Sequence, residues 1–120
     1  MVRRVRIEYF DHNEEFSRLL PRSGEVVDTR TDVYGNNDWL LVRLDAPLEY
    51  QMKVGDPFQF RLVRADHFLV RSRWAKVPIR LGEEPSVFIL LVETSESSIP
   101  DRFDPASYIQ AAWGTCVVEE

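Results

Sequence analysis

Three arginines near the middle of the chain have the residue type and spacing to hold an anion. Arg61, Arg71 and Arg73 lie in the stretch FQFRLVRADHFLVRSRW, residues 58–74. A guanidinium group presents a planar fork of donors that matches phosphate or carboxylate oxygens. The stretch therefore predicts a candidate site for a small anionic ligand, provided that the three side chains share one exposed face.

The charge distribution supports two interpretations of this stretch. The chain has a net charge of −5, yet residues 57–81 hold six basic side chains against a single acidic one, Asp66. Such a block is either a binding patch or one half of an internally compensated charge network. We favour the second interpretation, in which the arginines pair with carboxylates such as Asp45 or Glu93 on neighbouring strands.

The register of this stretch decides which side chains it exposes. We predict a β-hairpin over residues 58–74 with an odd loop at Ala65-Asp66-His67. A one-residue slip in a strand exchanges its two faces, and only an odd loop gives a nearly clean apolar side. In this register the aromatic side chains serve the core. Because single-strand binders stack bases on exposed aromatics, the prediction disfavours nucleic acid as a ligand.

Further polar residues raise other kinds of chemistry. Adjacent Asp66 and His67 have the types of a carboxylate-oriented general base, but no nucleophile motif such as G-x-S-x-G accompanies them. The segment DHNEE, residues 11–15, offers metal ligands without a known metal-binding spacing. Cys116 precedes two valines, as a small buried hydrophobic residue often does. We predict no catalytic site, no metal and no cofactor.

Three aromatic residues outside the arginine stretch are candidates for a pocket or an interface. Tyr34 and Trp39 flank a predicted turn, and Trp113 lies near the carboxyl terminus. Aromatic side chains are enriched in both kinds of site. The alternative is that a helix near the carboxyl terminus covers Trp39, and we favour it because large exposed apolar patches are uncommon on monomers.

Alternation of apolar and polar residues predicts the elements that position these side chains. The run VFILLV, residues 87–92, is apolar on both alternations and predicts a central strand covered on both faces. Short helices are expected after Asp11 and over residues 106–114, with Asp104 as the cap of the second. The remaining strands are expected around residues 2–10, 25–34, 39–45, 58–64, 68–74 and 115–120, with a further short strand around Tyr50.

These elements predict a mostly β protein. It is expected to be an antiparallel β-barrel or sandwich of about seven short strands with one or two short helices, in a single domain over residues 1–120. The predicted core side chains are Val5, Ile7, Leu40, Val42, Leu44, Phe58, Phe60, Leu62, Val70, Trp74, Phe88 and Leu90.

Composition places the chain among ordinary globular proteins. Hydrophobic residues make up 44% and charged residues 29%. The single cysteine cannot form an internal disulfide, and no apolar stretch has the length of a membrane span or a signal peptide. We expect a cytoplasmic protein that does not enter a membrane.

Three hypotheses for function follow from these patterns. The first is a non-catalytic interaction or assembly module with a protein partner or a second copy of itself. The second is a binder of a small anionic ligand or nucleic acid through Arg61, Arg71 and Arg73. The third is an enzyme whose catalytic groups meet only in the fold.

Overall fold

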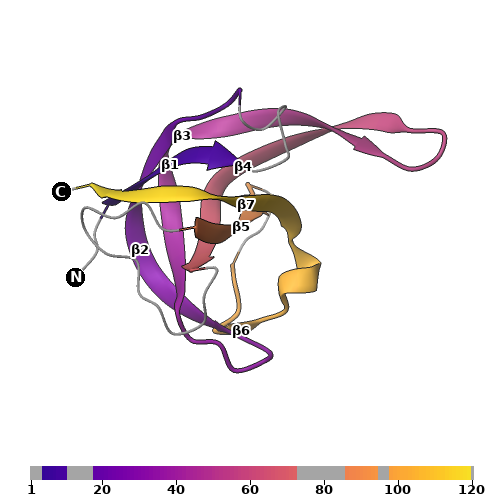
Figure 1. Ribbon diagram of the computed structural model, residues 1–120. Coiled ribbons are helices and arrows are strands. Elements are labelled where there is room, and N and C mark those ends of the chain that lie inside the picture. Colours follow the sequence, from indigo (N-terminus) through magenta and orange to yellow (C-terminus); the bar gives the residue numbers. More distant parts are fainter. Residues whose placement is uncertain (1–3, 11–17, 73–85, 95–97, 120) are drawn as a thin grey trace.

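The computed structural model describes residues 4–10, 18–72, 86–94 and 98–119 (Figure 1). These residues form seven strands and one short 3-10 helix: β1 (Arg4–Phe10), β2 (Arg22–Asp32), β3 (Trp39–Val54), β4 (Gln59–Ser72), β5 (Ser86–Glu93), β6 (Arg102–Phe103), η1 (Pro105–Ser107) and β7 (Ile109–Glu119). All seven strands belong to one sheet. The prediction of a mostly β, largely antiparallel protein is confirmed.

The sheet curls so that its first and second strands also meet. Its order is β1-β7-β5-β4-β3-β2-β6, with an additional pairing of β1 and β2, and only the short β6 runs parallel to its neighbour. Gly24 of β2 pairs with Val5 on one side and with Leu44 on the other. A Cβ atom at Gly24 would lie 2.5 Å from the carbonyl oxygen of Arg43. Glycine therefore permits the close approach of β2 to β3.

Apolar side chains lie on both faces of the central strands. The larger group, which we call the inner core, includes Val42 of β3, Phe68 of β4 and Ile89 of β5, all fully buried. The smaller group, the outer cluster, consists of Trp39, Leu41, Leu69, Leu90 and Val92, on the opposite alternation of the same strands, together with Phe103 of β6. As predicted, β5 is thus covered on both faces.

The segment between β5 and β7 covers the outer cluster. Ile99 and Tyr108 pack against this cluster from the chain that follows β5. The rings of Trp39 and Phe103 meet edge to face, with centroids 5.3 Å apart, and Phe88 makes a similar contact with Trp39 at 6.0 Å. Aromatic pairs prefer this geometry, which places the partly positive ring edge against the negative ring face.

A buried carboxylate organises the turn between β2 and β3. Asp32 is only 2% exposed and accepts hydrogen bonds from the backbone amides of Tyr34 and Asn36, from Asn36 Nδ2, and from Trp39 Nε1 at 3.0 Å. Burial on its own would raise the pKa of Asp32. The hydrogen bonds from Asn36 and Trp39 outweigh burial and hold that pKa below its ordinary value.

Half of the predicted core residues are fully buried. Val5, Ile7, Val42, Leu44, Val70 and Leu90 are buried, whereas Leu40 and Phe88 are partly buried and pack against the two clusters. Trp74 lies outside the described residues. The prediction was wrong for Phe58, Phe60 and Leu62, which are exposed.

The predicted hairpin over residues 58–74 was also wrong. Residues 59–72 form one strand, β4, and the hairpin turn lies at residues 55–58, between β3 and β4. The pairing of β4 with β5 shifts register between Ala65 and His67, which marks a β-bulge in the predicted loop. A bulge with one extra residue exchanges the two faces of a strand as an odd loop does, and the strand continues through it.

The predicted helix over residues 106–114 was wrong, although its cap was predicted correctly. Asp104 caps the 3-10 helix η1, where its carboxylate accepts from the amide of Ala106. The following residues form β7, which pairs with β1 and β5. Two strand neighbours supply backbone partners that override the local preference for helix. Residues 11–17 of the first predicted helix lie outside the described residues.

No helix in the described segments has the length and apolar character needed to cross a membrane.

Candidate interaction surface

The two longest strands extend beyond their neighbours and form an arm. Strand β3 pairs with β2 only as far as Leu44, and β4 pairs with β5 only from Ala65 onward. From Leu48 paired with Ala65 to Val54 paired with Gln59, the two strands continue together. We call residues 49–64 the arm, and Figure 1 shows it projecting from the curled sheet.

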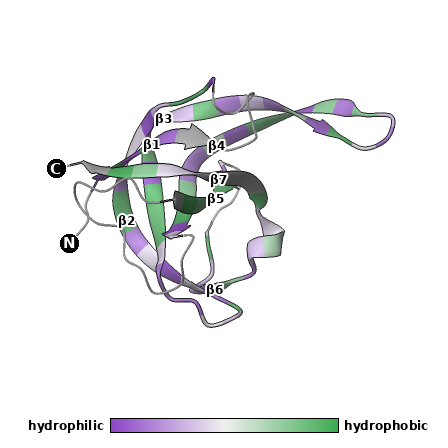
Figure 2. Cartoon of the chain, in the orientation of Figure 1, coloured by the Kyte–Doolittle hydropathy of each residue, from purple (hydrophilic) through white to green (hydrophobic). Residues whose placement is uncertain are grey.

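One face of the arm carries large apolar side chains in solvent. Phe58, Phe60 and Leu62 are 56%, 61% and 56% exposed. Phe60 and Leu62 lie two apart in β4 and point to the same side. Phe58 is the last residue of the turn before β4 and contacts Phe60, so the three side chains form a strip. The rings of Phe58 and Phe60 meet edge to face with centroids 5.7 Å apart, and Lys53 Nζ lies 5.0 Å from the centre of the Phe58 ring. Figure 2 shows hydrophobic residues continuing towards the tip of the arm.

The opposite face of the arm is anchored at its base. Val63 and Ala65 of β4 are fully buried, and Leu48 of β3 belongs to the inner core with Ala65. Tyr50, directly across from Val63, packs against the same core. The strip of Phe58, Phe60 and Leu62 therefore lies on the face that points away from the core.

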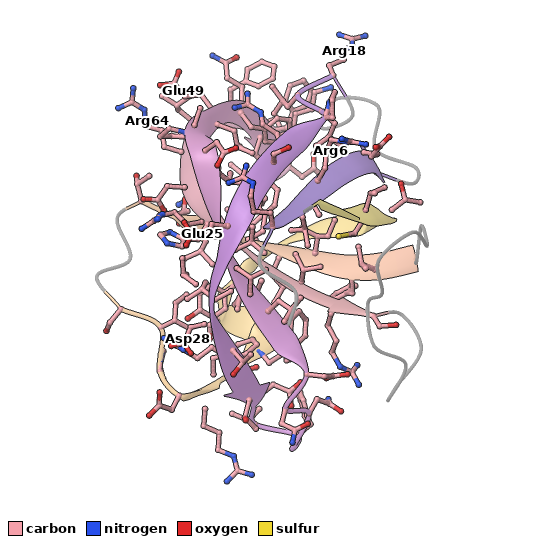
Figure 3. All side chains as sticks on the ribbon, turned by 90° about the vertical axis from the view of Figure 1, so that its left-hand side faces the viewer. Arg6, Arg18, Glu25, Asp28, Glu49 and Arg64 are labelled. Atoms are coloured by element: carbon pink, nitrogen blue, oxygen red, sulfur yellow. The ribbon has the colours of Figure 1, made fainter. Side chains whose placement is uncertain are left out.

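Two arginines of the arm are paired with carboxylates. Arg64 Nε donates to Glu49 Oε1 at 2.6 Å, and Figure 3 shows these two side chains next to each other. Arg61 Nη2 lies 2.5 Å from Glu93 Oε1. The expected pairing of this arginine with Glu93 is confirmed. Exposed pairs of this kind contribute about 0–1 kcal/mol to stability, so they orient the side chains more than they stabilise the fold.

The described structure does not bring the predicted arginine face together. Arg61 and Arg71 lie ten residues apart on β4, which corresponds to about 30 Å along an extended strand. Arg71 Nε donates to Asp38 at 2.6 Å, and its Nη2 donates to Asn36 at 3.1 Å. Arg73 lies outside the described residues.

Asp45, the other proposed partner of these arginines, pairs elsewhere. Its carboxylate accepts from Arg4 of β1, with Arg4 Nη1 at 3.1 Å from Asp45 Oδ1. The hydrogen bonds from Arg4 lower the pKa of Asp45. This ion pair therefore links β1 to β3, and Asp45 does not pair with an arginine of the arm.

The three predicted aromatic residues have different surroundings. Tyr34 is 76% exposed at the turn after β2. Trp39 is 3% exposed and belongs to the outer cluster, so its indole ring is covered, although not by a helix. Trp113 lies on β7, and its side chain is outside the described part of the structure. Tyr34 and Trp39 do not share a common surface.

Asp66 and His67 lie at the bulge of β4, beside a shallow pocket. Asp66 Oδ1 and His67 Nδ1 are 2.8 Å apart, which meets the geometry of an oriented imidazole. The pocket has a volume of about 240 Å³, and Val92 and Ile99 form part of its wall. Within the described segments no further side chain hydrogen-bonds to His67, so the third group of a nucleophile–base arrangement is missing there.

The pocket is also lined by Arg30, whose guanidinium group has partners within the chain. Arg30 forms an ion pair with Asp28, donates to the carbonyl oxygen of Thr29 at 2.8 Å, and directs its Nε at the carbonyl oxygen of Ile99 at 3.4 Å. The hydrogen bond from Arg30 lowers the pKa of Asp28. Because its donors have partners within the chain, this guanidinium fixes the segment around Ile99 to β2.

The metal-ligating candidates can be placed only in part. The segment DHNEE falls on residues 11–15, outside the described residues, and Cys116 is buried in the inner core. Among the residues that the structure describes, no three His, Cys, Asp or Glu side chains are grouped so that they could hold a metal ion.

The sequence did contain a signal for the arm that the prediction missed. Gly55, Asp56 and Pro57 have the residue types of a turn, and Gly55 has a φ of +81°. The runs on either side, EYQMKV and FQFRLV, both alternate in the manner of strands. A turn flanked by two such runs predicts a hairpin centred there. The assumption that phenylalanines must be buried favoured the other pairing.

Comparison with known proteins adds no assignment to these observations. No protein-family model, curated protein or solved structure matches the chain. The described residues therefore define a mostly antiparallel β protein with an apolar hairpin arm.

Proposed function

We propose that the chain is a non-catalytic interaction or assembly module that contacts a protein partner through the arm. The exposed strip of Phe58, Phe60 and Leu62 carries this proposal. Fully burying one such side chain contributes about 1.5–3 kcal/mol, so covering three that are already half-buried supplies roughly half of that for each. Contiguous apolar surface on a projecting element is typical of a protein contact.

The proposal includes the form of the domain and its location. We take the curled sheet to be a closed barrel of β1, β2, β3, β4, β5 and β7, within one domain over residues 1–120. Support comes from the pairing of β1 with both β2 and β7. A closed barrel has no free edge except where a hairpin extends beyond it, and the arm is such a hairpin. A cytoplasmic location is proposed from the single cysteine.

The arrangement of the other candidate sites favours contact over catalysis. Arg61 and Arg71 already have carboxylate partners, and Asp66 with His67 lacks a third group within the described residues. The exposed apolar side chains of the arm, in contrast, are available for contact with a partner. An apolar strip with charged neighbours is suited to a protein surface, where the strip supplies affinity and the charges supply specificity.

Site-specific photo-crosslinking tests this function in the cells that make the protein. A benzophenone-bearing phenylalanine analogue replaces Phe60, and the same analogue at Tyr34, which is also exposed but far from the arm in sequence, serves as the matched control. We expect adducts of defined mass at position 60 and few at position 34. Equal or absent adducts at the two positions would contradict a contact through the arm.

A further inference from the structure

The arm leaves one edge of β4 open to another strand. Beyond Ala65, β5 no longer pairs with β4, and Thr94 closes the shared region by donating its amide to the carbonyl oxygen of Arg64 at 2.9 Å. In the described part of the chain, β4 between Gln59 and Val63 pairs only with β3. A strand edge of this kind presents unpaired amides and carbonyls.

The contact at Arg64 shows which residues point to the open edge. Backbone groups of successive strand residues alternate between the two sides of the strand. Because the carbonyl group of Arg64 points away from β3, those of Leu62 and Phe60 do so as well. Phe60 and Leu62 of the apolar strip therefore also carry the backbone groups that no described strand pairs with.

We propose that a second copy of this chain adds to the open edge, with β4 against β4 in antiparallel orientation and Phe60 opposite Phe60 of the second copy. This inference rests on the proposed function of the arm and names its partner. The two Phe60 residues exchange a pair of backbone hydrogen bonds. Each Leu62 lies opposite Phe58, the last residue of the turn in the other copy. The strips of both chains then form one continuous apolar face across the pair.

The charges select this register over its neighbours. A pairing centred on Arg61 would place two guanidinium groups directly opposite each other, which is unfavourable. A pairing centred on Leu62 would need the edge at Asp66, where β5 already lies. With Phe60 at the centre, Arg61 lies opposite the neutral Gln59 of the second copy.

The two edges of the arm differ in their suitability for this pairing. On β3, the residues that alternate outward are Glu49, Gln51 and Lys53, and charged residues on an edge strand oppose pairing with another strand. On β4, the corresponding residues are Phe60 and Leu62. Since the arm projects from the sheet, the bodies of two antiparallel copies lie at opposite ends of the pair (Figure 1).

The contact is small, and its size sets the expected behaviour. About five residues from each chain take part, whereas stable interfaces involve about 20–30 residues on each side. The dimer is therefore expected to depend on concentration, with dissociation on dilution.

Single cysteines introduced on the strip test the register by oxidative cross-linking. Antiparallel partners have Cα atoms about 5.5 Å apart, within the range that a disulfide spans, whereas an offset of four residues adds about 13 Å. Phe60→Cys should give a disulfide-linked dimer on its own. Phe58→Cys and Leu62→Cys should each give no disulfide-linked dimer alone and form a linked dimer when mixed. The unaltered chain, whose Cys116 is buried, is the control.

Each outcome decides between the alternatives. Linked dimers of Phe58→Cys alone would indicate parallel strands and overturn the proposed register. Absence of cross-linking in all variants, with circular dichroism confirming the fold, would overturn self-pairing. In the photo-crosslinking experiment, adducts with this chain itself support the pairing. Adducts only with a different protein overturn the pairing while the proposed function of the arm stands.

Discussion

Asp32 stabilises the turn between β2 and β3 through its hydrogen bonds. Its carboxylate is almost fully buried and accepts from two amides and two side chains. A buried acceptor with all its partners in place is stabilising, and a buried donor that loses its acceptor is costly. The buried Trp39 Nε1 would be such a donor without an acceptor if the Asp32 carboxylate were removed.

We predict that Asp32→Asn lowers the free energy of unfolding by about 1–3 kcal/mol at neutral pH. The amide nitrogen that replaces one carboxylate oxygen cannot accept the hydrogen bonds from Trp39 and Asn36. The folded pKa of Asp32 lies below its ordinary value of 3.8, so its stabilisation is present above that value and is lost as the pH falls through the folded pKa. Urea unfolding at pH 7 and at pH 3 should show a smaller difference between the two proteins in acid. An equal difference at both pH values would contradict this role.

Gly24 supports a second prediction at the scale of one residue. Gly24→Ala places a methyl group 2.5 Å from the carbonyl oxygen of Arg43 and 2.6 Å from Val42 Cγ1. Backbone has to move to relieve these contacts, and we expect a loss of about 1–3 kcal/mol in the free energy of unfolding. Thr29→Ala, at an exposed position of the same strand, should change it by less than about 0.5 kcal/mol. Chemical denaturation of both variants measures the difference, and similar losses would argue against close packing at Gly24.

At the scale of elements, the exposed side chains of the arm are expected to contribute little to the stability of the fold. We predict that Phe60→Ala and Leu62→Ala each lower the free energy of unfolding by less than about 1 kcal/mol, because both side chains are more than half exposed. Val63→Ala, on the buried side of the same strand, should cost about 2 kcal/mol. Thermal and urea unfolding of the three variants tests this ranking. A cost at Phe60 equal to that at Val63 would mean that the strip is covered within the chain.

Elements differ in how far sequence alone could predict them. Strand β5 was predicted because six successive apolar residues require cover on both faces, and β1 because Val5 and Ile7 alternate with charges. The bulge at Asp66 could not be distinguished from a turn, because one extra residue exchanges the faces in either case. Strand β7 contains a helix-like pattern, and only its pairing with β1 and β5 decides its conformation.

The candidate site was predictable only in part for a related reason. The turn at Gly55 and the pairing of Arg61 with Glu93 follow from local patterns and charge. Whether Phe58, Phe60 and Leu62 face a core depends on where β2 and β5 end. The sequence around these three residues does not determine the lengths of those two strands. Burial is a property of neighbours, so apolar character could not locate the surface.

At the scale of the whole molecule, the pairing of β1 with β2 determines whether the sheet closes. Arg6 of β1 lies opposite Ser23 of β2. Opposing residues in antiparallel strands have Cα atoms about 4.5–5.5 Å apart, which suits a disulfide. We predict that a variant carrying both Arg6→Cys and Ser23→Cys forms an intramolecular disulfide on mild oxidation and unfolds at a higher denaturant concentration than its reduced form. Each single variant is the control, and failure of the double variant to cross-link would contradict closure.

The difference in support between the arm and the rest of the sheet also affects how quickly a contact could be released. Strands β3 and β4 have two neighbours through most of the sheet, but within the described residues the arm has only its own two strands. A hairpin held from one side can open locally at a lower free energy than the whole domain. A partner bound there would be held by a part of the sheet that opens more readily than the body, so fraying of the arm would offer a route to dissociation that leaves the body folded.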